Sequence, residues 1–463
     1  MLSKSLIEDV LTAAVSTGGD FAEIFAEDKN NTNLTLVGGK LEKSVSGKIY
    51  GIGIRIFKGF NYLYAYTNNL SRDNLIKVAK EAASTIKGVK KDIILNFNKG
   101  IINNIHPIEI MPDSISKMQK VDLMKTAYEA AKSYDSLISQ VKVQYLDEIQ
   151  NVLIANTEGR LVEDKRIRTR ILINSVAAKD NVMQTGLHFP GAQKGYEFFN
   201  EINVKDYAED SARMAKTMLM AEYCPSGRMP VIINNGFGGV LFHESCGHGL
   251  EATRVAKNTS VFSHMLDQEI ASQLVTAIDD GTIPNQWGSC NIDDEGNNTR
   301  KNILIENGIL KNYMIDKFNG RRMNMEPTGS GRRESYKYAP TSRMTNTYIA
   351  SGKSTIDDII ANTEYGLFAK YLGGGSVNPS TGEFNFAVRE GYIVKNGKIN
   401  RPVRGATLIG TGMEVLEKID MVGDNVDFSQ GICGSISGGV PVNVGQPTLR
   451  VSEMTVGGRD GER

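Results

Sequence analysis

The sequence predicts an α+β fold in two parts. In the N-terminal half, amphipathic helices flank strands that are joined by short turns, which is typical of an antiparallel sheet. In the C-terminal half, short strands and glycine-rich turns predominate, which indicates a mainly-β half built around one histidine-bearing helix. A chain of 463 residues also exceeds what one ordinary hydrophobic core supports. We therefore expect an N-terminal α+β domain over residues 1–222 and a C-terminal β-rich domain over residues 223–463.

The first elements follow from hydrophobic spacing. Leu6, Val10, Leu11 and Ala14 form one stripe, which predicts a helix over about 3–16. Alternating runs then predict an antiparallel meander, and Ser71 is a suitable N-cap for a second helix.

A polar connection near residues 88–113, which contains Pro107 and Pro112, could divide the N-terminal half into two subdomains. Beyond it, we expect a helix around 116–133, further strands, and a closing helix around 204–221. In the predicted strand region over residues 160–180, the charged side chains indicate a strand face in contact with solvent; they are Lys165, Arg166, Arg168 and Arg170.

The C-terminal half is expected to begin near residue 224, where the sequence changes to short strands, glycine-rich turns and long irregular connections. A helix is expected to start at the histidine motif, and another runs through 260–275. Most of the remainder is predicted as strands, with Asn396-Gly397 as a hairpin turn.

Composition excludes several classes of protein. The 53 basic and 53 acidic residues cancel, so no overall field favours nucleic acid or an anionic membrane. No run approaches the roughly 20 apolar residues that a membrane span requires, and the N-terminus does not read as a secretory signal. Four cysteines in this length do not make a disulfide framework. We expect a cytoplasmic protein.

The segment "HESCGHG" places His243, Glu244 and His248 within six residues. Imidazole suits zinc, and a glutamate beside the first ligand is placed to act as general base toward a bound water. On a regular α-helix, however, residues five apart point about 140° away from each other. The motif therefore requires a π-bulge, or a helix that ends or bends at Gly247. The alternative interpretation is a buried helix that happens to carry histidines.

A third ligand cannot be chosen from spacing. The candidates are Cys246, His264, Cys290, Cys433, and the acids of "IDDGT" and "NIDDEGN". From spacing alone, each lone cysteine is better explained as a small buried hydrophobic residue.

Four segments together resemble a known family. The segments "HESCGHGLEA", "IDDGTIPNQWGSCNIDDEGNNT", "SGRRESY…RMTNTY" and "GICGSISGGVPVNVGQPTLRVSEMTVGG" resemble the TldD branch of the TldD/PmbA metalloproteases. The PmbA (TldE) branch is similar overall but lacks the metal motif. "GICGSISGG" reads less charged after the cysteine than the family pattern.

The resemblance implies a zinc-dependent peptidase that acts on unfolded or extended peptides. It implies that His243, His248 and Cys433 bind Zn²⁺ and that Glu244 is the catalytic acid/base. It also implies a dimer, formed with a second copy or with a PmbA (TldE)-like subunit.

Substrate contacts are expected in the segment "GRRESYKYAPTSRMTNTY", from Arg332, Arg333, Arg343 and Asn346, although a basic solvated loop would read the same way. The acidic loops at 279–280 and 293–295 are expected to be structural. Two other functions stay open: a cysteine-dependent hydrolase that uses Cys246 or Cys433, and a non-catalytic scaffold subunit or structural zinc protein.

Overall fold

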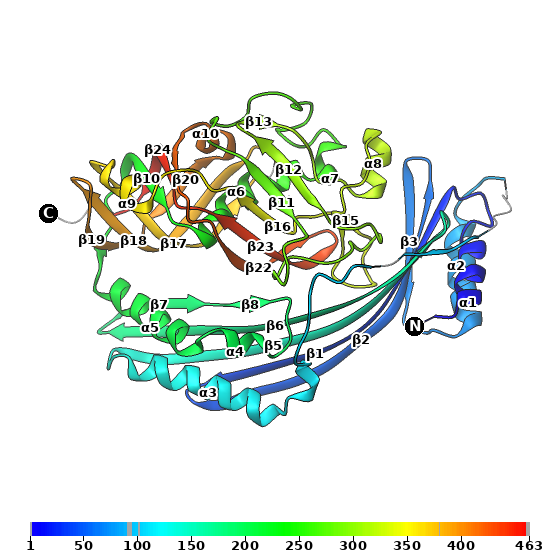
Figure 1. Cartoon of the computed structure of the whole chain (residues 1–463), viewed down its shortest axis with the longest axis horizontal. Helices are drawn as coiled ribbons and strands as arrows, with labels where there is room; N and C mark the ends of the chain where they lie inside the picture. Colours follow the sequence, from blue (N-terminus) through cyan, green and yellow to red (C-terminus); the bar gives the residue numbers. More distant parts are fainter. Residues whose placement is uncertain (1, 90–94, 101, 379, 460–463) are drawn as a thin grey trace.

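The computed structural model describes residues 2–89, 95–100, 102–378 and 380–459. The chain forms two layers (Figure 1): a long curved sheet from the N-terminal half, and above its concave face a body built from the C-terminal half. The α+β class is confirmed.

The N-terminal sheet has the order β3-β2-β1-β5-β6-β4, with β7 and β8 also paired to β6. Its main pairs are antiparallel, and the tight β1–β2 turn at Gly38 and Gly39 has positive φ angles of 57° and 79°. The strands are β1 (Phe21–Val37), β2 (Lys40–Lys58), β3 (Asn61–Thr67), β4 (Asn98–Lys99), β5 (Ile138–Asn156), β6 (Arg160–Lys179), β7 (Val182–His188) and β8 (Gly191–Ala192).

Two helix pairs cover this sheet, each over its own hydrophobic core. The helices α1 (Lys4–Ala14) and α2 (Arg72–Ser84) pack together at one end, and α3 (Lys117–Ser133) and α5 (Val204–Met220) lie along the outer face (Figure 1). A short helix, α4 (Phe198–Glu201), precedes α5. The helices predicted at 3–16, after Ser71, at 116–133 and at 204–221 are all present.

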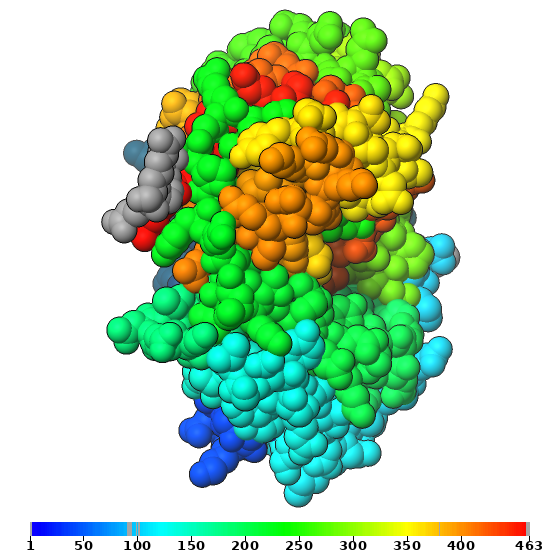
Figure 2. Space-filling model, turned by 90° about the vertical axis from the view of Figure 1, so that its left-hand side faces the viewer, coloured from blue at the N-terminus to red at the C-terminus, as the bar shows by residue number. Residues whose placement is uncertain are grey.

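Capping explains two of the starts. The Ser3 hydroxyl accepts from Leu6 N at 3.3 Å, and Ser116 forms a reciprocal capping box with Gln119. Seen from the side (Figure 2), α5 lies between the outer helix α3 and the strands of the C-terminal half, and it contacts β18 and β19.

The C-terminal half contains two larger sheets and one small one. One sheet has the order β17-β10-β24-β20-β18-β19-β9, with β21 paired to β24; the other has the order β13-β12-β11-β16-β23-β22; and β14 pairs with β15. A large core includes residues of both larger sheets together with Leu241 and Phe242. The strands are β9 (Glu222–Tyr223), β10 (Gly227–Ile233), β11 (Ala277–Asp280), β12 (Lys301–Glu306), β13 (Ile309–Leu310), β14 (Gly331–Arg332), β15 (Thr341–Ser342), β16 (Asn346–Ile349), β17 (Tyr365–Val377), β18 (Glu383–Lys395), β19 (Lys398–Arg404), β20 (Thr407–Thr411), β21 (Ile419–Val422), β22 (Asp427–Ser435), β23 (Gly438–Gln446) and β24 (Leu449–Gly457).

Helices in this half are short: α6 (Val240–Ser245), α7 (Ala252–Val255), α8 (Lys317–Met323), α9 (Ile356–Ala361) and α10 (Gly412–Glu417). The predicted hairpin turn at Asn396-Gly397 is confirmed between β18 and β19, with positive φ at both residues. None of the helices in the described part of the chain has the length and apolar character needed to cross a membrane.

The helix predicted over 260–275 is wrong. This stretch consists of turns, bends and one isolated β-bridge at Glu269, and His264 and Asp267 have φ angles of 63° and 61°, which a right-handed helix does not allow. Phe262, Ile270 and Val275 are nevertheless buried in the large core. The apolar residues in this stretch are therefore spaced by their burial in the core and not by the period of a helix.

The solvated strand face predicted for β6 is also wrong at its centre. Arg166 and Arg168 are 5% and 4% exposed, because the concave face of the sheet is covered by a loop of the C-terminal half. Arg166 Nη1 donates to Asp294 Oδ1 at 2.6 Å, and Arg168 Nε donates to the Trp287 carbonyl at 3.1 Å. The structural role expected for the acidic loop at 293–295 is thereby confirmed.

Candidate metal centre

The histidine motif lies on a helix that ends inside the motif. α6 ends at Ser245, Cys246 leaves the helical region with φ −124° and ψ −47°, and a 3₁₀ turn, η3 (Gly247–Leu250), follows. His243 therefore lies on α6 and His248 on η3. The break predicted near Gly247 is present.

Two glycines allow the close packing that positions α6. A Cβ atom on Gly239, in the preceding 3₁₀ turn η2 (Gly236–Gly239), would lie 2.5 Å from the Gly445 carbonyl oxygen of β23. A Cβ atom on Gly247 would lie 2.4 Å from the Met344 sulfur. The backbone of β23 thus packs closely before the start of α6, and the buried side chain of Met344 packs closely after its end.

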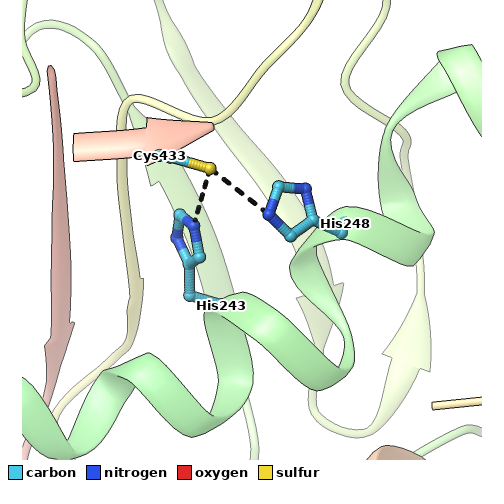
Figure 3. A group of neighbouring side chains, drawn as sticks. All are labelled: His243, His248 and Cys433. Atoms are coloured by element: carbon cyan, nitrogen blue, oxygen red, sulfur yellow. Dashed lines mark hydrogen bonds between the residues drawn. The ribbon is translucent and has the colours of Figure 1, made fainter. Parts of the chain in front are cut away.

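The three residues converge from distant parts of the chain (Figure 3). His243 Nε2 and His248 Nε2 each lie 3.3 Å from Cys433 Sγ, on β22. The imidazole, imidazole and thiol ligand atoms lie within 4.8 Å of one another, and all three residues are buried. Among the described residues this is the one group of three histidine, cysteine or acidic side chains that lie so close together.

The two imidazoles change the acidity of the thiol. Burial alone would raise the pKa of Cys433, but His243 and His248 outweigh it and lower that pKa to about 4. The pKa of His248 is in turn raised well above its ordinary value: burial opposes the charge, while Glu251 and Cys433 favour it more strongly. The thiolate is the form of cysteine that binds metals.

This donor set fits a metal ion. Two imidazole nitrogens and a thiolate are ligands that zinc accepts, and three protein ligands leave a fourth position open. Glu244 lies beside one of these ligand atoms, with Oε2 at 3.7 Å from His248 Nε2 and a side chain that is 32% exposed. A carboxylate with access to solvent therefore stands next to the ligand atoms.

The other candidates for a third ligand lie elsewhere. The Cys246 sulfur contacts Ser245 Oγ at 3.5 Å, and burial raises the pKa of the Cys246 thiol to about 12. Cys290 is buried beside the arginines that join the two halves, and burial raises its pKa too. His264 lies in the turn region that replaces the predicted helix.

The four residues expected to contact substrate are all buried, with donors that bind other protein groups. Arg332 donates to the Met344 and Pro441 carbonyls, Arg333 donates to Glu23, and Asn346 donates to the Asp280 carbonyl and Ser289. Arg343 is 0% exposed and donates to the carbonyls of Cys433 and Gly438. These contacts join segments of the protein.

Sequence reasoning missed Glu251. Its Oε2 atom lies 3.1 Å from His248 Nδ1, in position to accept that N–H, and the residue is 3% exposed. The available signal was a carboxylate three residues after a candidate ligand, since metal-binding histidines commonly donate their second ring nitrogen to a carboxylate.

Comparison with family models matches most of the chain. Residues 22–86 match "PmbA/TldA metallopeptidase domain 1", residues 110–219 match the central domain of the same family, and residues 226–458 match its C-terminal domain.

Individual relatives extend over nearly the whole chain. A metalloprotease TldD homolog from Buchnera aphidicola is 41% identical over 421 residues, which cover 88% of this chain and 86% of the relative. One from Haemophilus influenzae is 37% identical over 451 residues, covering 95% and 93%. The crystal structure of TldE from Thermococcus kodakarensis is similar in fold, with a TM-score of 0.78 at 18% identity over 97% of this chain and 99% of that chain.

Proposed function

Because this chain belongs to the PmbA/TldD metallopeptidase family, we propose that it is a zinc-dependent peptidase with Glu244 as its general base. The observation that carries the proposal is the convergence of two imidazoles and a low-pKa thiol beside one solvent-accessible carboxylate. A structural zinc site would usually be closed by a fourth protein ligand.

His243 Nε2, His248 Nε2 and Cys433 Sγ would hold the ion. When bound, zinc polarises a carbonyl oxygen and lowers the pKa of water into the neutral range. The contribution of this chain is to fix the three ligand atoms, through the helix break at Cys246 and the strand pairing of β22 with β23.

Glu244 moves the proton. Its carboxylate accepts a proton from the attacking water and delivers it to the leaving amine nitrogen, which is the usual work of a general acid and base in amide hydrolysis. In the described part of the chain Glu244 pairs with His248 (Oε2 to Nε2, 3.7 Å), and no arginine or lysine lies within ion-pairing distance of its carboxylate.

An extended peptide is the substrate that we propose. The strand that carries Cys433 is the outermost strand of its sheet, and its hairpin exposes Ile432 (57%) and Ile436 (67%). A cavity of about 360 Å³ separates this hairpin from the N-terminal sheet, and its lining includes Trp287, Ile432 and Pro441. Extended chains bind by such edges and apolar hollows without requiring a folded partner.

We also propose that the peptidase works in the cytoplasm as a dimer. The partner is a second copy or a TldE-like subunit; a fold shared with a TldE structure supports the second possibility. A non-catalytic scaffold role would be expected of a chain that lacked the histidine motif.

A second candidate function is a cysteine-dependent hydrolase. It is favoured by one observation: Cys433 is flanked at 3.3 Å by two imidazoles that lower the pKa of its thiol to about 4, the arrangement of an activated thiolate.

One experiment separates the two. Purified protein is analysed for metal and assayed on an unfolded peptide, with and without chelator, with and without a TldE-like subunit. Stoichiometric zinc and cleavage that chelator abolishes and zinc restores support the metallopeptidase. Metal-free protein whose chelator-insensitive activity is lost on thiol alkylation would replace it with the cysteine hydrolase.

A further inference from the structure

Arg343 contacts both segments that supply the ligands, although it belongs to neither. It lies between β15 and β16 and is 0% exposed. Given the proposed metal site, on which this inference rests, we propose that Arg343 and Glu251 are positioning residues that together fix His248 relative to Cys433.

On the strand side, Arg343 holds the end of the β22–β23 hairpin. Its Nη2 donates to the carbonyl oxygen of Cys433 itself. Its Nη1 donates to Ser437 Oγ at 2.9 Å and to the Gly438 carbonyl at 2.8 Å. One guanidinium therefore binds the ligand residue and the turn that follows it.

On the helix side, the same guanidinium faces Glu251. Arg343 Nε lies 3.8 Å from Glu251 Oε1, while Glu251 Oε2 lies 3.1 Å from His248 Nδ1. Arg343 Nε and Glu251 Oε1 are both buried, and neither has a hydrogen-bond partner in the described part of the chain. The result is a continuous path from the His248 ring through Glu251 and Arg343 to the backbone of Cys433.

The chemistry of each group matches this task. A carboxylate at Nδ1 fixes the orientation and tautomer of His248 and leaves Nε2 to face the metal position. A guanidinium is a rigid planar fork that can hold several acceptors at fixed angles, whereas a lysine ammonium is a flexible point charge. Arg343 faces three acceptors on the β22–β23 hairpin and the Glu251 carboxylate on the helix side. A planar guanidinium can hold all four at once, whereas an ammonium group cannot.

Arg332 offers a matched control. It is buried to a similar degree (4% exposed) and also donates to two carbonyls, those of Met344 and Pro441, at 2.5 and 2.7 Å. In the described structure it contacts neither Glu251 nor a proposed ligand. A replacement of Arg332 therefore removes a buried arginine from the same region without altering the contacts between His248, Glu251, Arg343 and Cys433.

The test uses the full chain loaded with cobalt, which reports ligand geometry by absorption. Arg343→Lys, Glu251→Gln and Arg332→Lys are compared with wild type. Cobalt affinity is measured by competition with a chromophoric chelator, and the fold of the metal-free proteins is measured by circular dichroism. We expect Arg343→Lys and Glu251→Gln each to weaken affinity about 10- to 100-fold and to shift the cobalt bands. Arg332→Lys should keep the wild-type spectrum.

A double variant tests whether the two residues act together. If they act through one path, the loss in Arg343→Lys/Glu251→Gln is smaller than the product of the single losses. A folded Arg343→Lys protein with wild-type affinity and bands would overturn the inference. Should that variant not fold, wild-type affinity and bands in Glu251→Gln overturn it equally. If wild-type protein itself gives no thiolate-to-cobalt band, the metal site fails, which is a separate outcome.

Discussion

The imidazole rings of His243 and His248 lie 5.2 Å apart, centroid to centroid, at an interplanar angle of 81°. They reach this arrangement because α6 ends between them and η3 turns the second ring back toward the first. A continuous α-helix would separate the two side chains by about 140° around its axis. The helix break is therefore part of the proposed metal centre.

Gly247→Ala is expected to weaken metal binding. The added methyl would lie 2.4 Å from the Met344 sulfur, and Met344 is 0% exposed, so the turn that carries His248 must shift. Overpacking of this kind typically costs about 1–3 kcal/mol. Equilibrium unfolding and chelator competition measure the two effects. The double variant Gly247→Ala/Met344→Ala should recover affinity; if it binds metal no better than Gly247→Ala, steric pressure from Met344 is not the cause.

Glu244→Gln should retain metal and lose peptide cleavage. The amide keeps the size of the side chain but cannot accept a proton, and removal of a general base typically slows a reaction about 10²- to 10⁴-fold. Metal analysis and single-turnover cleavage of an unfolded peptide check both parts. Turnover at the wild-type rate by the metal-loaded variant would remove Glu244 from the mechanism.

Cys433→Ser should reduce the metal content, whereas Cys246→Ser should not. Both thiols are buried, but only the Cys433 sulfur faces the two imidazoles; the Cys246 sulfur lies against Ser245. Elemental analysis of the two purified variants provides the comparison. Equal zinc in Cys433→Ser and wild type would rule out the sulfur as a ligand.

Arg55→Met should destabilise the contact between the two halves. Arg55 Nη2 donates to Glu23 Oε2 at 2.9 Å and to Glu295 Oε1 at 2.6 Å, and all three side chains are at most 1% exposed. Removing the cation leaves the buried Glu295 carboxylate without an ion-pair partner among the described residues, while Glu23 keeps its pair with Arg333. Leaving one buried charge unpaired in this way costs about 3–5 kcal/mol. Arg401→Met, which breaks a surface pair with Glu222, is the control and should change stability by less than about 1 kcal/mol. Similar unfolding midpoints for the two variants would contradict this account.

His106 should make stability depend on pH. It is 2% exposed, its Nδ1 accepts from the Asn285 N–H at 3.0 Å, and burial together with Arg168 lowers its pKa from 6.5 to about 4. The unfolded chain therefore binds the proton first, so this contribution is intact above pH 6.5 and falls as the pH drops toward 4. The loss amounts to roughly 3 kcal/mol. Chemical denaturation between pH 7 and 4 measures it.

His106→Gln is the matched variant, because the amide oxygen can still accept from Asn285 but does not titrate. Its stability should decline less steeply over the same pH range. A slope equal to that of wild type would assign the pH dependence to other groups.

Local signals predicted much of the fold. Hydrophobic spacing located the helix that begins after Ser3, and a suitable N-cap residue located the helix that begins after Ser71, since these features act within a few residues. Alternation likewise predicted the strands of the first sheet. The burial of Arg166 and Arg168 was not predicted, because it depends on the C-terminal half covering that sheet. The alternation of apolar and polar residues along a strand does not show which other segment packs against its polar face.

The same distinction applies to the metal centre. The pair His243 and His248, with Glu244 and the need for a break at Gly247, could be predicted from one short segment. Cys433 could not be selected by spacing, because it lies 190 residues from His243 and meets it only through the pairing of β22 with β23. Family resemblance supplied it. Arg343 was predicted to contact the peptide substrate, because the sequence does not report that its side chain is buried.

The distance in sequence between the ligands also orders events during synthesis. A ribosome that has finished α6 and η3 has produced two imidazoles but must add a further 185 residues after His248 before the sulfur exists. Until then the nascent chain contains only two of the three proposed metal ligands. Glu244 then lies beside an incomplete site. Completion of the proposed metal centre is thereby tied to near-completion of translation of the chain.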